Sequence, residues 1–165
     1  MPDYFTLSEL TVSTLATREG IDNAPPQDIV LVLVETVQRL NEVRKLLGSP
    51  MHVNSGYRCE ALEKILCKKD YAAWCKRRSY RQHDASWNLY FSNKAHPKGH
   101  AVDFTCDGFG TPVDIVKEIA ASKIQFDQLI EEGTWVHLSF APAMRREVLT
   151  ATFNLDGSPN YVKRT

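Results

Sequence analysis

Three side chains in the second half of the chain have the donor types of a metal site. His96 and Asp103 lie in one short phrase, and His137 lies in another, Trp135-Val-His137. Two imidazoles and one carboxylate form a three-ligand zinc set, which keeps a fourth coordination position open for water. An open zinc ion is typical of catalysis, whereas structural zinc is closed by four ligands, mostly Cys. If the fold brings the three together, they predict a zinc hydrolase.

The segments around these residues are predicted to bring them together. Asp103 is the seventh residue after His96, so the chain between them must turn back for both side chains to reach one metal. Gly99 between them permits the tight backbone that this turn requires. Residues 101–105 are expected to form a buried strand, and His137 lies in the middle of another at 135–140. Because strand side chains alternate between faces, a neighbouring strand can present His137 against Asp103.

The remaining pattern predicts helices first, then mixed strands and helices. A capping box at Thr6–Glu9 opens the first helix, and apolar residues at spacings of three and four predict a long amphipathic helix that ends at Gly48. The other predicted elements are helices at 60–66, 111–122 and 145–150, and strands at 51–54 and 126–131. This pattern is typical of an α+β domain with a small antiparallel sheet flanked by helices.

The length of 165 residues suits a single domain with a buried core, predicted over residues 1–155. An excursion at about 68–94 is basic and aromatic, and its weak periodicity predicts an irregular, partly helical segment. Residues 156–165 are expected to form a flexible C-terminal tail.

Composition narrows the classes of partner. The formal net charge is zero, so no overall field favours nucleic acid. No run of 18 apolar residues predicts a membrane span, and no Sec-type signal peptide is visible, so synthesis in the cytoplasm is expected. The four Cys form no C-x-x-C pair and are interpreted as reduced thiols. The oligomeric state is left open.

Four short phrases of the sequence occur in a fixed order. They are Ser55-Gly-Tyr-Arg58, His96-x-x-Gly99-x-Ala101-x-Asp103, Phe126-Asp-Gln-Leu-Ile130 and Trp135-Val-His137-x-Ser139. With these phrases the chain resembles the peptidase M15 family of zinc D-Ala-D-Ala carboxypeptidases and phage endolysin relatives, in the pattern of its subfamily A, over about residues 5–150. Each phrase alone is weak evidence, but the ordered set is specific. The resemblance implies the zinc peptidase fold of D,D-peptidases and hedgehog-like domains.

The resemblance also implies roles for the ligands and for the first phrase. At the matching positions of the family, His96, Asp103 and His137 bind Zn²⁺. Arg58 is expected to bind a substrate carboxylate or carbonyl, since its planar fork matches a carboxylate. Ser55 is grouped with it as a substrate-binding residue that organises the turn.

A general base must take a proton from the zinc-bound water and later return it to the leaving amine. Glu131 and Glu132, shortly before the Trp-Val-His phrase, are both candidates, and Glu132 is preferred. Two positions depart from the usual family pattern, because Lys94 replaces a Ser and Glu63 stands where an Asn is frequent. These departures bear on substrate preference more than on metal binding.

The interpretation that follows is a zinc metallopeptidase that cuts amide bonds in peptidoglycan stem peptides. It would act as a D,D-carboxypeptidase or as an L-Ala–D-Glu endopeptidase. A chain made in the cytoplasm for a substrate in the cell wall suggests a phage-encoded protein, released through a holin or carried on the virion.

Two alternatives come from other classes of protein. One is a non-catalytic M15-like structural module of a phage particle, which would bind zinc without hydrolysis. The other is a cell-wall binding domain that uses the basic and aromatic stretch from Lys64 to Phe91, and whose binding would survive loss of zinc.

Overall fold

The computed structural model describes residues 3–164, and in it side-chain alternation gives the sheet an apolar face and a polar face. In β2 (Ala101–Thr105) and β4 (Val136–Ser139), Asp103 and His137 lie between apolar side chains of the main core. The fully buried apolar neighbours are Val102, Phe104, Val136 and Leu138. The period of two therefore directs both candidate ligands to the face opposite the core.

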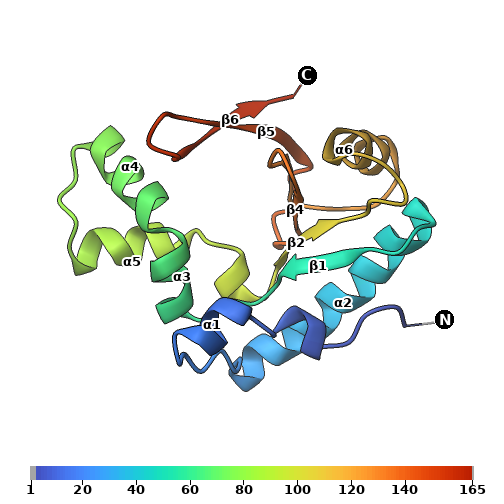
Figure 1. Ribbon diagram of the computed structural model, residues 1–165, viewed down its shortest axis with the longest axis horizontal. Helices are drawn as coiled ribbons and strands as arrows, with labels where there is room; N and C mark the ends of the chain where they lie inside the picture. Colours follow the sequence, from blue (N-terminus) through green and yellow to red (C-terminus); the bar gives the residue numbers. More distant parts are fainter. Residues whose placement is uncertain (1–2, 165) are drawn as a thin grey trace.

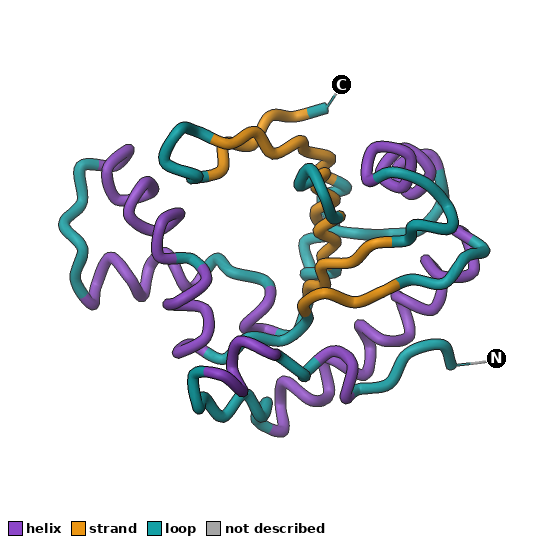
Figure 2. The backbone as a smooth tube through the Cα atoms, viewed as in Figure 1, coloured by secondary structure: helices purple, strands orange, loops and turns teal. Residues whose placement is uncertain are grey.

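The sheet has six strands in the order β1-β2-β4-β3-β5-β6 (Figures 1 and 2). The remaining strands are β1 (His52–Ser55), β3 (Gln128–Glu131), β5 (Glu147–Phe153) and β6 (Pro159–Lys163). β3 and β5 run parallel, and all other neighbouring strands run antiparallel. The predicted α+β class is confirmed, while the sheet is mixed rather than wholly antiparallel.

Two helices supply most of the core that covers the apolar face. They are α2 (Gln27–Leu47) and α6 (Pro112–Ala121), and both were predicted. Gly48 ends α2 with a φ of 64°, and the Thr111 side chain caps the start of α6. Among residues 3–164, no helix combines the length and the apolar character that a membrane crossing requires.

The N-terminal capping box is present, but the helix that it opens is short. The backbone N–H of Thr6 donates to Glu9 at 2.7 Å, and the N–H of Glu9 donates to the Thr6 hydroxyl at 3.3 Å. A 3-10 helix follows at Ser8–Leu10, and a separate α1 spans Thr14–Arg18. The expected single helix is divided because the Ser13 side chain caps a new start.

The excursion after β1 is more regular than predicted. α3 (Glu60–Leu66), as expected, is followed by α4 (Lys68–Arg78) and α5 (Asp84–Ser92), which project together on one side of the sheet (Figure 1). Their aromatic side chains form a second small core around Tyr71, Cys75, Trp87 and Tyr90. The weak periodicity of this segment thus reflects packing of two helices on each other rather than irregular chain.

The C-terminal part differs from expectation. The helix predicted at 145–150 is wrong, because β5 occupies residues 147–153 between β3 and β6. Residues of the segment expected to be a flexible tail form β6, which pairs with β5 through a turn containing Asp156-Gly157. Gly157 has a φ of 79°, the left-handed conformation that such hairpin turns favour.

Candidate metal centre

The three predicted ligands meet on the polar face of the sheet. Asp103 of β2 lies directly opposite His137 of β4, so their side chains share that face. His96 begins the 3-10 helix His96–Lys98 that precedes β2. One ligand atom from each of the three residues lies within 4.8 Å of the others, and two of the side chains are buried. The predicted constellation therefore forms in space.

Hydrogen bonds fix which atoms face the centre. His96 Nδ1 lies 2.7 Å from the carbonyl of Gly56, so this nitrogen donates and Nε2 is left to accept or to bind a metal. His96 Nε2 lies 3.2 Å from Asp103 Oδ1, and His137 Nδ1 lies 2.9 Å from the same oxygen. The bond from His96 to Gly56 is of the kind that orients metal-binding imidazoles.

The electrostatics suit a divalent cation. Burial lowers the pKa of His96 and the Arg58 guanidinium lowers it further, which favours the neutral imidazole that a metal requires. Burial acts to raise the pKa of Asp103, but the two imidazoles and Arg58 outweigh it and hold that pKa well below its usual range. The donor set of two nitrogens and one carboxylate oxygen fits Zn²⁺.

Two glycines shape the backbone around His96. Gly99 has a φ of 76°, and a Cβ atom there would lie 3.2 Å from both Ile29 and Leu33. A Cβ atom on Gly56 would lie 2.3 Å from the Leu10 carbonyl oxygen, so only glycine permits this close approach. Gly56 is thereby held where its own carbonyl can orient His96.

Arg58 contacts the candidate ligand Asp103 and two further side chains. Its Nη2 donates to Asp103 Oδ2 at 2.5 Å, and its Nε donates to the Ser55 hydroxyl at 2.9 Å. Its Nη1 lies 3.5 Å from the buried carboxylate of Glu63. All three guanidinium nitrogens therefore have partners in the protein. Arg58, predicted with Ser55 to bind substrate, lines the cavity and also holds Asp103, while Ser55 accepts a hydrogen bond from its Nε.

The two glutamates considered as the general base have different positions. Glu132 lines the cavity that contains His137, whereas the Glu131 side chain accepts the backbone N–H of Gly133 at 2.8 Å in the turn. Burial raises the pKa of Glu132 to about 6, and Asp103 adds to the rise while His137 opposes it. Glu132 therefore lies in the same cavity as the candidate ligands and has a raised proton affinity.

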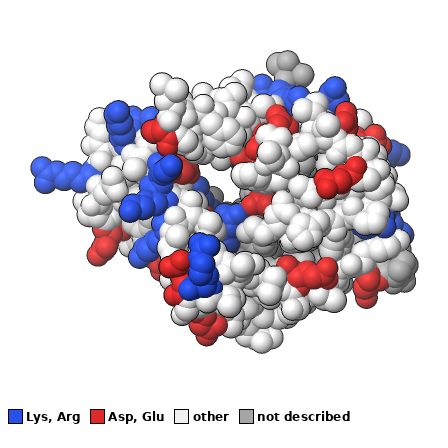
Figure 3. All heavy atoms as spheres, in the orientation of Figure 1, with Lys and Arg blue, Asp and Glu red and all other residues white. Residues whose placement is uncertain are grey.

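A cavity of about 660 Å³ opens over the three ligands. The ligands form its floor, while α3 and α4 form one wall and the β5–β6 hairpin forms the opposite wall. Figure 3 shows this hollow in the middle of the molecule, with Lys and Arg side chains gathered along one rim. The volume suits a short peptide.

The sequence prediction missed the hairpin wall. Phe153, Pro159 and Tyr161 line the cavity from β5 and β6. Two signals were present: alternation of apolar and polar residues from 149 to 153, and an Asp156-Gly157 pair between two strand-forming segments. Lys69 and Asp70 of α4 were also missed as cavity residues, because the placement of α4 depends on tertiary packing.

The basic and aromatic stretch does not present a row of aromatic rings to solvent. Tyr71 packs edge-on against Trp87 at 5.2 Å between ring centroids, and both are buried. Tyr80 is exposed, but it packs against Trp74. The aromatic residues thus serve mainly to hold α4 against α5.

Part of the chain matches a known family. The family model described as Peptidase M15 matches residues 3–66, a part that contains Arg58 and Ser55 but ends before the three candidate ligands. No curated protein and no solved structure matches the chain. The matched part contains the Ser-Gly-Tyr-Arg phrase, and the ligand phrases lie after it in the sequence. The family model thus supports, over residues 3–66, the peptidase M15 family that the motifs indicate.

Proposed function

We propose that the chain is a zinc-dependent peptidase that hydrolyses amide bonds in peptidoglycan stem peptides, as a D,D-carboxypeptidase or an L-Ala–D-Glu endopeptidase. The observation that carries the proposal is the cluster of His96, Asp103 and His137 on the floor of a cavity that Glu132 also lines. The M15 match supports a peptidase of this kind. The bacterial wall as substrate rests on the resemblance of the motifs.

Each residue of the site has a separate role in the proposed hydrolysis. Zinc held by His96, Asp103 and His137 would lower the pKa of a coordinated water to about 7. Glu132, with its pKa raised to about 6, is mostly deprotonated at neutral pH and can take the proton from the attacking water. It then gives that proton to the amine nitrogen as the C–N bond breaks. Arg58 keeps Asp103 ionised and oriented throughout.

The test combines metal analysis with digestion of the proposed substrate. Zinc is quantified in the purified protein, which is then incubated with purified peptidoglycan, and the released ends are identified by mass spectrometry. We expect about one zinc per chain and new amine and carboxyl ends. His137→Ala should lose both, whereas His52→Ala, at an exposed histidine of β1, should keep both.

Each contrary outcome has a definite meaning. Zinc without new ends from several wall types would favour the non-catalytic structural module. Binding to wall fragments that persists in His137→Ala, without hydrolysis, would favour the wall-binding domain. If no zinc binds after reconstitution, the assignment of the three ligands fails.

A further inference from the structure

The charged side chains of the cavity are unevenly paired. Its cationic side chains are Arg58, Lys68, Lys69 and Lys94. Arg58 is held by Asp103, and Lys94 Nζ donates to Asp70 at 3.0 Å. The two lysines that begin α4 have no ion-pair or hydrogen-bond partner within residues 3–164. One end of α4 therefore presents uncompensated positive charge to the cavity.

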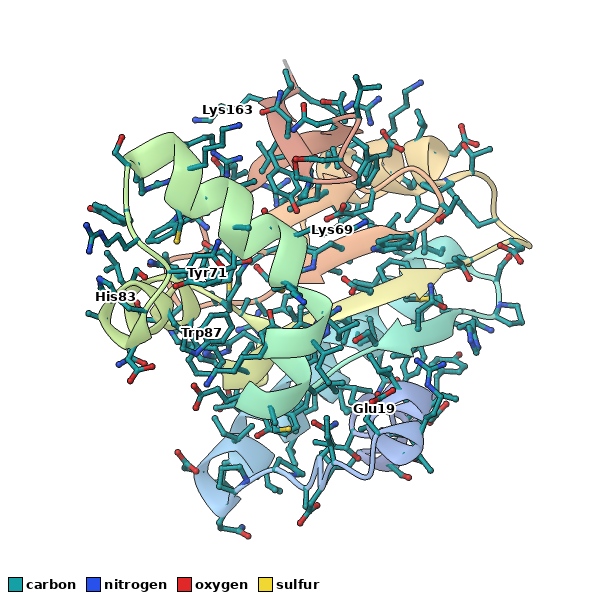
Figure 4. The ribbon with its side chains drawn as sticks, turned by 60° about the vertical axis from the view of Figure 1, so that its left-hand side comes forward. Glu19, Lys69, Tyr71, His83, Trp87 and Lys163 are labelled. Carbon is teal, nitrogen blue, oxygen red and sulfur yellow. The ribbon has the colours of Figure 1, made fainter. Side chains whose placement is uncertain are left out.

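Lys69 occupies a defined place at the cavity mouth. Its ammonium lies 3.5 Å from the position that a Cβ atom would take on Gly157, in the turn between β5 and β6. The side chain thus reaches from α4 on one wall to the hairpin on the other, and Figure 4 shows it on the side of α4 toward the strands. An anion entering this mouth would meet the ammonium.

Both candidate reactions present such an anion at the same place. In a D,D-carboxypeptidase substrate, the residue whose nitrogen leaves carries the free C-terminal carboxylate. In an L-Ala–D-Glu substrate, the leaving nitrogen belongs to D-Glu, whose α-carboxylate is free because the chain continues through the γ-carboxyl. In each case the carboxylate is attached to the same carbon as the leaving nitrogen.

Asp103, Ser55 and Glu63 already contact the three nitrogens of Arg58, whereas Lys69 has no such partner within residues 3–164. We propose that Lys69 binds the carboxylate on the leaving-group side of the scissile bond and so makes the site selective for acids over amides. This inference rests on the proposed peptidase function. It names a specificity-determining residue that lies on α4, outside the four sequence phrases.

The test uses substrates that differ only in this group. Steady-state kinetics are measured on a peptide with the free carboxylate and on the same peptide with a carboxamide there. For Lys69→Met, kcat/KM on the acid should fall about fivefold, the size of one solvent-exposed ion pair, through KM. The carboxamide should react as it does with the unchanged protein. Salt at about 0.5 M should shrink the preference for the acid.

Lys76→Met is the matched control. Lys76 lies two turns further along the exposed side of α4 and does not line the cavity. The positive charge of Lys76 acts to lower the pKa of Asp156 in the same hairpin turn. Lys76→Met therefore tests whether any loss of charge between α4 and the hairpin is enough to reduce the preference for the acid. We expect Lys76→Met to keep the preference for the acid.

The outcomes distinguish failure of the proposed role of Lys69 from failure of the proposed peptidase function. Equal losses on acid and amide in Lys69→Met, or no loss on either, would overturn the role of Lys69 while leaving the peptidase intact. If the unchanged protein cleaves neither peptide, the proposed function fails. Calorimetric binding of the acid and the amide by the zinc-loaded protein then decides the matter for Lys69. Acid-selective binding that Lys69→Met abolishes supports the inference, and binding without selectivity refutes it.

Discussion

Arg58 connects the metal ligands to the start of the helical excursion. It contacts Asp103 on one side and Glu63 on the other, and its side chain is only 14% exposed. Removing one partner of a buried charge network leaves the others unpaired. This arrangement explains why an Arg is needed two residues after the glycine that orients His96.

We expect Arg58→Met to destabilise the protein by about 3–5 kcal/mol, because it leaves buried charge unpaired. Zinc affinity should fall by about 10- to 100-fold, since Asp103 loses its orienting partner. Chelator competition and urea unfolding measure the two effects. Arg18→Met, at an Arg that is 72% exposed, should change neither. Wild-type zinc affinity in Arg58→Met would show that Asp103 needs no such support.

Glu132→Gln should lower kcat by about 10²- to 10⁴-fold without loss of zinc, because the general base is removed while the ligands remain. Glu131→Gln should retain activity, since that side chain serves the turn. Metal content and turnover are measured on the same preparations. Equal activity in the two variants would remove Glu132 from the mechanism.

The pH dependence follows from the same carboxylate. Burial raises the pKa of Glu132 to about 6, and the base works only when deprotonated. Activity should therefore be present above that pKa and fall as the pH drops through about 6. A bound cation would lower the pKa of Glu132 and move this fall to a somewhat lower pH. A profile of kcat/KM from about pH 4 to 8 measures this limb. If the residual activity of Glu132→Gln falls with decreasing pH in the same way, the titration belongs to another group.

At the scale of elements, the segment from β1 to α3 is fixed by close packing against the N-terminal 3-10 helix. Tyr57 N–H donates to the Leu10 carbonyl at 2.6 Å, and the absence of a side chain at Gly56 permits that approach. The same peptide segment orients His96. Local backbone geometry and metal binding are therefore coupled at this point.

Gly56→Ala should destabilise the protein by about 1–3 kcal/mol, because the new Cβ forces the backbone apart. It should also weaken zinc binding, since the carbonyl that holds His96 moves. Gly108→Ala is the control, because its Cβ would meet Ser49 at an ordinary 3.4 Å. Thermal unfolding and zinc titration of both variants test the coupling. Normal zinc affinity in a destabilised Gly56→Ala protein would separate stability from metal binding.

Sequence reasoning reached the parts of the fold that local patterns determine. Alternation around Asp103 and His137 predicted their strands, and the structure brings both against His96 as expected. The parallel pairing of β3 with β5 could not be foreseen, because the charged residues around Arg145 concealed the start of a strand. The pairing of Arg58 with Asp103 joins residues 45 positions apart, which no local pattern reports.

At the scale of the whole molecule, metal binding should stabilise the fold, because the three ligands join β2, β4 and the 3-10 helix before β2. Free zinc at about 100 times its Kd should add about 2.7 kcal/mol to the free energy of unfolding. Melting temperatures with zinc and with a chelator measure the gain. His137→Ala should lose the zinc-dependent shift, and an equal shift in that variant would place the ion elsewhere.

The β5–β6 hairpin follows all three ligands in the chain and yet supplies a wall of their cavity. The hairpin joins the rest of the sheet through the pairing of β5 with β3, so it can detach without parting β2 from β4. A chain with the hairpin detached would hold its ligands on a half-open surface, without the wall that confines a peptide. Docking of these two strands would thus be the step that turns the ligand cluster into an enclosed site.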